Sequence, residues 1–136
     1  MHSPELAPGM LQLADAILRG SSLPDQLREL VIVRVGHVYQ APYELHHHES
    51  IGRLVGMSQA ALAAAVGGSS EGLAVLRCTD PLLSRHTLSE AERAEVLEFL
   101  SVGQLSDLVI TVGCYQLVRN FLNTIGVTTE GETSPY

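Results

Sequence analysis

The sequence has few charged residues, and basic residues are the minority among them. Charged residues make up 17% of the 136 positions, and eight Lys and Arg stand against fifteen Asp and Glu, which gives a net charge of −7. Counterion release opposes the binding of nucleic acid or an anionic membrane surface to such an acidic chain. We therefore expect neither of these as a partner.

Targeting segments and cysteine motifs are also missing. The opening MHSPELAPGM carries Pro and Glu where a signal peptide has its basic and apolar regions. No apolar run reaches the roughly 20 residues that cross a bilayer. The two cysteines, Cys78 and Cys114, are 36 residues apart, which is neither a CxxC motif nor a disulfide framework. We expect a cytoplasmic protein with two reduced, packed thiols.

Apolar residues, by contrast, are abundant. They make up 46% of the chain, and the mean hydropathy is +0.18. Beside so little charge, this excess favours a homo-oligomer that hides apolar surface between subunits, with an unusually well-filled monomer core as the alternative. The length fits one domain with its own core. We expect that domain to span residues 1–136, with flexible ends at residues 1–8 and 128–136.

The apolar residues recur with helical spacing, and no segment indicates a sheet. The sequence therefore predicts an all-α fold, a single-domain helical bundle. A capping box at Ser89 and Glu92 opens one helix, and Gly126 ends the last one. Asp80 and Pro81 look like the cap and first turn of another helix. The expected helices cover residues 10–18, 27–40, 43–55, 59–67, 71–77, a segment from 81, 90–100 and 105–125.

The segment 27–40 is dense in β-branched residues and nearly apolar all round. Fourteen residues are long for a strand and ordinary for a helix, and such a helix belongs in an interior. Glu29, Gly36 and His37 fall on one helical stripe, so the carboxylate and the imidazole share a face. Gly36 would let another backbone or a ligand come close.

The next expected helix carries three consecutive histidines. Helical geometry turns His46, His47 and His48 about 100° apart, so at most one or two of them serve one site. Glu44 lies four residues before His48 on the same face. A carboxylate beside an imidazole fixes its tautomer and raises its basicity, as acid–base catalysis requires. The alternatives are an exposed surface pair, or a metal site of His37, Glu44 and His48.

The two helices are joined by a short connection around Ala41 and Pro42, so we expect antiparallel neighbours. Glu29, near the start of the first helix, then lies beside residues late in the second. We predict that Glu29, Glu44 and His48 converge on one pocket, with His48 the nearer partner of Glu29. A separation above about 8 Å between Glu29 and His48, too long for a bridging water, would contradict this prediction.

These segments resemble a known family. The run RELVIVRV, followed by YELHHH and ESIGRLVGMS, is similar to the carboxymuconolactone decarboxylase and alkylhydroperoxidase D-like family. Its pattern is an R-E-L-x-I-L-R helix, then Y-E-W-x-x-H, then A-G-hydrophobic-S. The closing GCYQLVRNFLNTIGV looks like that family's last helix, so the resemblance covers about residues 10–127. It implies an all-α bundle of the alkylhydroperoxidase D-like type and a homo-oligomer, usually a trimer or hexamer.

The family's peroxidase branch uses a CxxC pair with an upstream glutamate and a histidine four residues after the second cysteine. Glu29 and His48 match the glutamate and the histidine, but the cysteine positions fall on Ala41 and Glu44. Disulfide-based peroxide reduction needs both thiols, so an alkylhydroperoxidase-like antioxidant function is disfavoured. The decarboxylase-like branch remains. Leu45 stands where that branch often has Trp, which leaves the substrate open.

The family's type reaction, from aromatic degradation, removes CO₂ from a lactone acid without a cofactor or metal. The resemblance implies a lyase that acts on a small lactone or keto acid, with His48 as proton donor and Glu29 and Glu44 as groups that orient or relay. A catalytically inactive helical oligomer is the rival interpretation. The candidate substrate-binding residues are Tyr43, His37 and Arg34, with Arg53 as a further candidate for the substrate's carboxylate.

Overall fold

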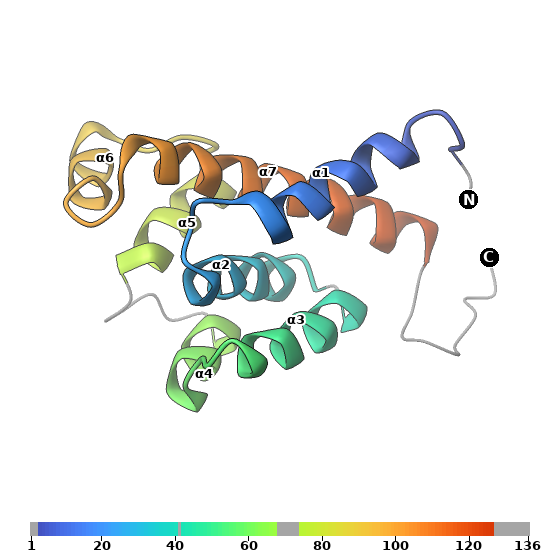
Figure 1. Ribbon diagram of the computed structural model, residues 1–136, viewed down its shortest axis with the longest axis horizontal. Coiled ribbons are helices and arrows are strands. Elements are labelled where there is room, and N and C mark those ends of the chain that lie inside the picture. The colour runs from blue at the N-terminus through green and yellow to red at the C-terminus, as the bar shows by residue number, and fades with distance from the viewer. Residues whose placement is uncertain (1–2, 41, 68–73, 127–136) are drawn as a thin grey trace.

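The structure, a computed structural model, describes residues 3–40, 42–67 and 74–126, and it describes the side chains of these residues except 42–47 and 66–67. These ranges hold seven helices and no strand, so the predicted all-α fold is confirmed (Figure 1). The helices are α1 (Ala7–Gly20), α2 (Asp25–Val38), α3 (Pro42–Leu54), α4 (Gln59–Gly67), α5 (Ala74–Ser84), α6 (Glu90–Val96) and α7 (Val102–Ile125).

Helix α2 is the centre of the bundle. It contacts α3, α4, α5 and α7, and Figure 1 shows it between α1 and α7 on one side and α3 and α4 on the other. A helix with neighbours on several sides needs apolar residues on several faces. Accordingly Val31, Ile32, Val33 and Val35 are fully buried. The expected burial of the segment 27–40 is therefore confirmed.

Helices α2 and α3 run antiparallel, as the short connection predicts. The side chain of Gln26, in the first turn of α2, donates a hydrogen bond of 3.1 Å to the carbonyl oxygen of Val55, just past the end of α3. Between the helices, Gln40 has φ 49°, a left-handed conformation that ends α2 and reverses the chain. This arrangement brings the start of α2 beside the later turns of α3.

The helix expected to start at Pro81 begins earlier than predicted. Pro81 was expected in a first turn but lies inside α5. Buried Val75 and Leu82 stand on either side of it and hold the helix against the core across the missing hydrogen bond. The carbonyl oxygens of Val75 and Asp80 also accept hydrogen bonds from the hydroxyls of Thr79 and Ser84.

The boundaries of α6 and α7 follow their caps. The predicted capping box of Ser89 and Glu92 is present, but α6 ends at Val96 rather than near residue 100. Ser101, expected within a break, is instead the N-cap of α7, where it forms a second capping box with Gln104. Gly126 closes α7 with φ 77°, as predicted. None of the helices within the described ranges is long and apolar enough to cross a membrane.

Candidate active site

The predicted meeting of Glu29 and His48 is confirmed. Glu29 Oε2 lies 2.8 Å from His48 Nδ1, a hydrogen-bonded pair that joins the second turn of α2 to the middle of α3. The Glu29 side chain is fully buried and that of His48 is 3% exposed. A buried carboxylate beside Nδ1 favours the tautomer in which Nδ1 carries the proton and Nε2 carries the lone pair.

The second oxygen of Glu29 is also occupied. Arg28 Nε lies 3.2 Å from Glu29 Oε1, and the Arg28 NH1 group lies 2.7 Å from an oxygen of Asp25. Burial of a carboxylate is costly unless its oxygens are paired, and here each oxygen has its own partner. Arg28 therefore fixes the carboxylate in place, so that Glu29 faces His48 with one defined oxygen.

Two residues of α7 complete the surroundings of the imidazole. The ring of Tyr115 meets the ring of His48 edge-on, with centroids 5.2 Å apart and an interplanar angle of 88°. The Arg119 guanidinium carbon lies 5.5 Å from the centroid of the Tyr115 ring, and its NH2 group donates to the carbonyl oxygen of Ile32 at 3.3 Å. Tyr115 is 2% exposed and Arg119 is fully buried. Three helices thus enclose His48.

Gly36 makes room for this arginine. A Cβ at Gly36 would lie 2.9 Å from the NH2 nitrogen of Arg119, closer than real Cβ contacts come. The sequence predicted a close approach at Gly36 by another backbone or a ligand. The group that approaches is the end of a side chain from α7.

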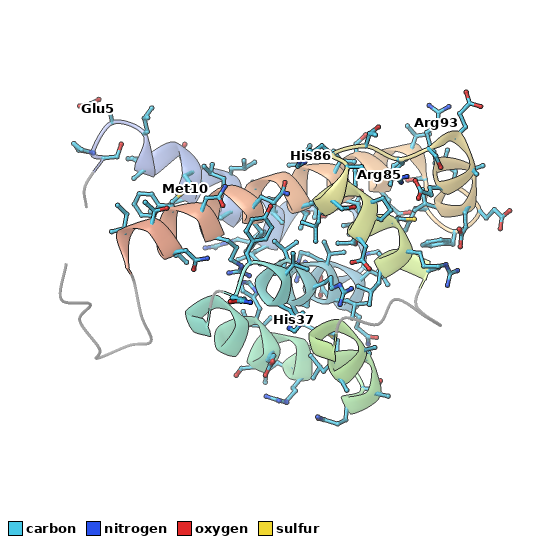
Figure 2. The ribbon with its side chains drawn as sticks, turned by 180° about the vertical axis from the view of Figure 1, so that it is seen from behind. Glu5, Met10, His37, Arg85, His86 and Arg93 are labelled. Carbon is cyan, nitrogen blue, oxygen red and sulfur yellow. The ribbon has the colours of Figure 1, made fainter. Side chains whose placement is uncertain are left out.

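The other predicted site residues fall in three places. The side chains of Tyr43 and Glu44 lie outside the described residues, although both positions belong to α3, so their roles stay predictions. His37 is half-buried in the last turn of α2, two turns and about 12 Å along the axis from Glu29. Figure 2 shows His37 well away from Arg85, His86 and Arg93 at the α5–α6 end of the molecule.

The arginines named for a substrate carboxylate already have partners. Arg34 forms a two-pronged ion pair with Asp80, at 2.7 and 2.9 Å, and donates to the carbonyl oxygen of Ala65 at 3.2 Å. Arg53 is exposed and lies 3.7 Å from Glu49 one turn earlier. The Arg34 contacts tie α2 to α4 and α5. Neither arginine touches Glu29 or His48 among the contacts described.

The sequence reasoning missed Arg28, Tyr115 and Arg119. Arg28 precedes Glu29 directly, and adjacent helical residues do not face one another, so spacing gave no signal. Tyr115 and Arg119 are four apart in α7, a polar pair on one face of a largely apolar helix. That pair could have indicated that this face of α7 packs against polar groups rather than against the apolar core alone. Its partner on α2 lies more than 80 positions away in sequence, beyond any local pattern.

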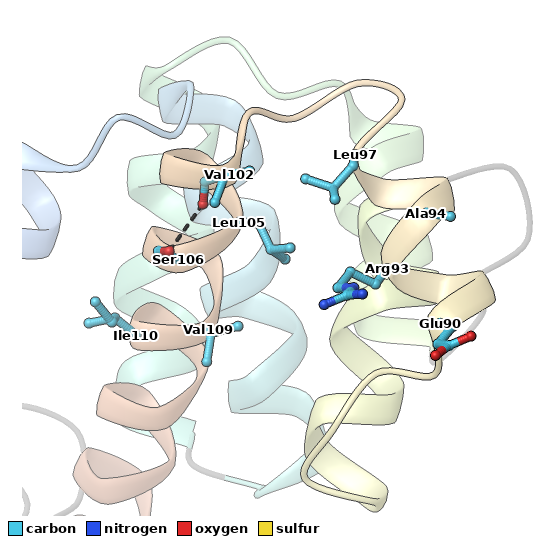
Figure 3. A pocket seen from close by; sticks show the side chains of 9 residues that line it. All are labelled: Glu90, Arg93, Ala94, Leu97, Val102, Leu105, Ser106, Val109 and Ile110. Carbon is cyan, nitrogen blue, oxygen red and sulfur yellow. Dashed lines mark hydrogen bonds between the residues drawn. The ribbon is translucent and has the colours of Figure 1, made fainter.

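Two surface hollows that are lined by described residues lie away from this pair. A hollow of about 600 Å³ separates α6 from α7, with Arg93 reaching from α6 toward α7 between apolar side chains (Figure 3). Another of about 430 Å³ lies between α1 and α7, lined by Leu6, Met10 and Phe121 among others. Neither is lined by Glu29 or His48. Among the described residues, no three His, Cys, Asp or Glu side chains gather as a metal ion would need.

Comparison with known proteins places the chain in a family. The model of the carboxymuconolactone decarboxylase family matches residues 4–80. This segment is more than half of the chain and contains both Glu29 and His48, whereas Tyr115 and Arg119 lie beyond it. No curated protein matches the sequence. The chain belongs to the carboxymuconolactone decarboxylase family.

Proposed function

We propose that this protein is a cofactor-independent lyase that removes CO₂ from a small lactone or keto acid. The observation that carries the proposal is the buried pair of Glu29 and His48, 2.8 Å apart. A carboxylate held against an imidazole away from water is suited to proton transfer, because nearby charges act more strongly there than in bulk solvent. Family membership agrees with this chemistry.

The reaction divides into two steps. The bond between the substrate carboxylate and its carbon breaks, CO₂ leaves, and the electron pair enters a conjugated carbonyl to give an enolate. His48, protonated on both nitrogens, then gives its Nε2 proton to that carbon and later takes one back from solvent. Glu29 stabilises the imidazolium through Nδ1 and keeps the ring oriented. Tyr43 is proposed as a hydrogen-bond partner of the substrate, and Glu44 as a second orienting carboxylate.

One alternative route to decarboxylation is closed in this chain. Enzymes that form a Schiff base with a keto acid need a lysine amine. The sequence contains no lysine, because all eight basic residues other than histidine are arginines. A lysine Schiff base is therefore excluded, which agrees with a substrate whose own carbonyl accepts the electrons, as in a lactone or β-keto acid.

We also propose that the enzyme is a homo-oligomer, with a second copy covering the apolar outer side of α6 and α7. Large apolar side chains there remain exposed, at 71% for Val102, 48% for Ile110 and 43% for Phe99. Burial of such residues stabilises an interface by about 25 cal/mol per Å² of apolar surface. Light scattering should show a multiple of 14.6 kDa that Ile110→Glu reduces. A 14.6 kDa particle at micromolar concentration would reject the assembly.

A substrate screen tests the activity. The wild-type protein and His48→Asn are incubated with a panel of β-keto and lactone acids, and CO₂ release is recorded. The Asn amide can still donate to Glu29 from the Nδ1 position but cannot exchange a proton, so the buried carboxylate keeps a partner. We expect wild-type turnover on at least one acid and a loss of about 10²- to 10⁴-fold in His48→Asn.

Two results would contradict the proposal. If wild-type protein releases no CO₂ from any acid of the panel, the inactive helical oligomer becomes the better interpretation. If both proteins release CO₂ equally fast, His48 is not the proton donor. Circular dichroism of both proteins shows whether His48→Asn remains folded.

A further inference from the structure

The orientation of His48 depends on more than its hydrogen bond to Glu29. The hydrogen bond at Nδ1 restrains the ring, but hydrogen-bond angles can depart from linear by tens of degrees before the interaction weakens steeply, so the ring keeps some rotation about its Cβ–Cγ bond. A second contact narrows that rotation and with it the direction of Nε2, which points at the substrate in the proposed reaction. Tyr115 supplies one, because its ring meets the imidazole edge-to-face at 5.2 Å and 88°.

Tyr115 in turn is held by Arg119. The guanidinium packs on the ring at 5.5 Å, and its NH2 group donates to the carbonyl oxygen of Ile32 on α2. Arg119 is fully buried, so its charge is held by fixed protein groups rather than by water. The arginine therefore links the position of the tyrosine ring to the backbone of α2.

The guanidinium can hold this position because residue 36 is glycine, and any larger residue would require the end of the Arg119 side chain to shift. Ile32 and Gly36 are one turn apart on α2, and the guanidinium lies along this turn, with NH2 only 2.9 Å from where a Cβ at residue 36 would be. Glycine weakens a helix interior relative to alanine. An alanine here would stabilise the helix but displace the arginine. Its effect on stability and its effect on the position of Arg119 therefore differ in sign and can be measured separately.

We propose that Gly36, Arg119 and Tyr115 form a positioning unit that fixes the ring plane of His48 and thereby the direction of Nε2. None of the three needs to touch the substrate. The consequence for turnover rests on the proposed function, but the effect on the ring itself does not. Two members of the unit, Tyr115 and Arg119, lie on α7, outside the segment that the family model matches. In this proposal α7 therefore helps to shape the site.

The test is nitrogen NMR of the His48 ring in the full chain, with turnover measured beside it. At a pH where the ring is neutral, the wild-type protein should show one tautomer, protonated at Nδ1, and narrow signals. Gly36→Ala and Tyr115→Leu should give mixed tautomers or broadened signals and, on a substrate found by the screen, about 10- to 100-fold slower turnover. Tyr115→Phe keeps the ring edge and should retain the wild-type spectrum.

Gly113→Ala is the matched control. Gly113 lies on α7 two residues before Tyr115, and a Cβ there meets nothing within 4 Å. It should leave the His48 spectrum and turnover unchanged. Arg119→Lys keeps the charge but loses the planar group, so its spectrum should lie between those of the wild type and Gly36→Ala.

The outcomes separate the two proposals. Altered His48 signals in Gly36→Ala and Tyr115→Leu support the positioning unit even if no acid is a substrate. Wild-type signals in both variants overturn it, even if the protein is an active decarboxylase. Thermal unfolding identifies a variant that does not fold. If a variant does not fold, the His48 signals of Tyr115→Phe and Arg119→Lys are compared instead. Wild-type signals in Arg119→Lys would equally overturn the positioning unit.

Discussion

Helix α2 makes two buried charged contacts with its neighbours, and a proton affects them very differently. Arg34 donates two hydrogen bonds to Asp80, of 2.7 and 2.9 Å, and an arginine stays charged at any ordinary pH. Glu29 meets His48 through one bond of 2.8 Å, and histidine gains or loses a proton near neutral pH. The first pair is suited to hold helices together, and the second to move a proton.

The surroundings of the two pairs agree with this division. The Asp80 side chain is 31% exposed, so water reaches one end of the arginine pair. Glu29 and His48 are buried, the ring of Tyr115 packs edge-on against the imidazole, and Arg119 packs on Tyr115. A fold that needed only a link between α2 and α3 would be served as well by apolar residues. The comparison therefore supports the proposal that Glu29 and His48, rather than Arg34 and Asp80, carry the chemistry.

Removing the charge of Glu29 should give the largest effect. In Glu29→Gln an amide oxygen can still face Nδ1, but the negative charge that stabilises the imidazolium is gone. We expect turnover to fall by about 10²-fold, near the lower limit for acid–base catalysis. The measurement is steady-state CO₂ release at equal folded concentrations. Unchanged turnover would reduce Glu29 to a structural partner.

The matching change in the other pair should affect stability instead. Asp80→Asn removes the charge that faces Arg34, and we expect the free energy of unfolding to fall by about 1–3 kcal/mol, with turnover per folded molecule unchanged. Urea unfolding followed by circular dichroism measures the first quantity. A loss of turnover without a loss of stability would return Arg34 to the substrate-binding role that the sequence suggested.

The two thiols should have no part in the chemistry. Burial raises the pKa of Cys78 to about 11, and the carboxylates of Glu95 and Glu92 contribute. The thiol therefore stays protonated at neutral pH, and its burial favours the folded state until the pH rises through about 9 to 11. Cys78→Ser with Cys114→Ser should leave turnover within about twofold, since neither position matches the family's redox pair. A large loss in a folded double variant would reopen a thiol mechanism.

The smallest effect on the free energy of unfolding is expected at Asp107, a half-buried carboxylate that accepts hydrogen bonds from the side chain and backbone of Ser22. Hydrogen bonds from the Ser22 side chain and backbone, and from Ser21, lower its pKa below the ordinary value of 3.8. Asp107→Asn should cost about 1 kcal/mol at pH 7, because the site is only half-buried. The carboxylate stabilises the fold above pH 3.8 and loses that effect as the pH falls through its lowered pKa. The difference in the free energy of unfolding between the wild-type protein and Asp107→Asn should therefore decrease as the pH falls. Urea unfolding at several pH values measures this difference.

Local sequence signals predicted most of the helices and the central pair. The 3.6-residue spacing and a short connection were enough to set Glu29 beside His48, because antiparallel neighbours leave few registers. The Ser-x-x-Glu/Gln capping pattern that predicts the helix start at Ser89 also occurs at Ser101 and Gln104, where the prediction had a break. Pro81 was misplaced because a proline after an aspartate is typical of a helix start, while the packing against the core that lets α5 continue past it is a tertiary effect.

The surroundings of His48 could not be predicted in the same way. Tyr115 and Arg119 come from the other end of the chain, and nothing in their spacing says which face of α2 they meet. Gly36 carried a true signal, a need for close approach, but not the identity of the group that approaches. Site geometry that depends on packing between distant helices follows from the fold and not from local pattern.

The central claim is that His48 delivers a proton to the substrate carbon, and product formed in D₂O tests it most directly. With a substrate whose carbon becomes a stereocentre after deuteration, wild-type protein should place deuterium on a single face, because a fixed Nε2 delivers it from one side. His48→Asn should show only slow turnover without that preference. Equal deuteration of both faces by the wild-type protein would show that water supplies the proton after release, and would contradict the account.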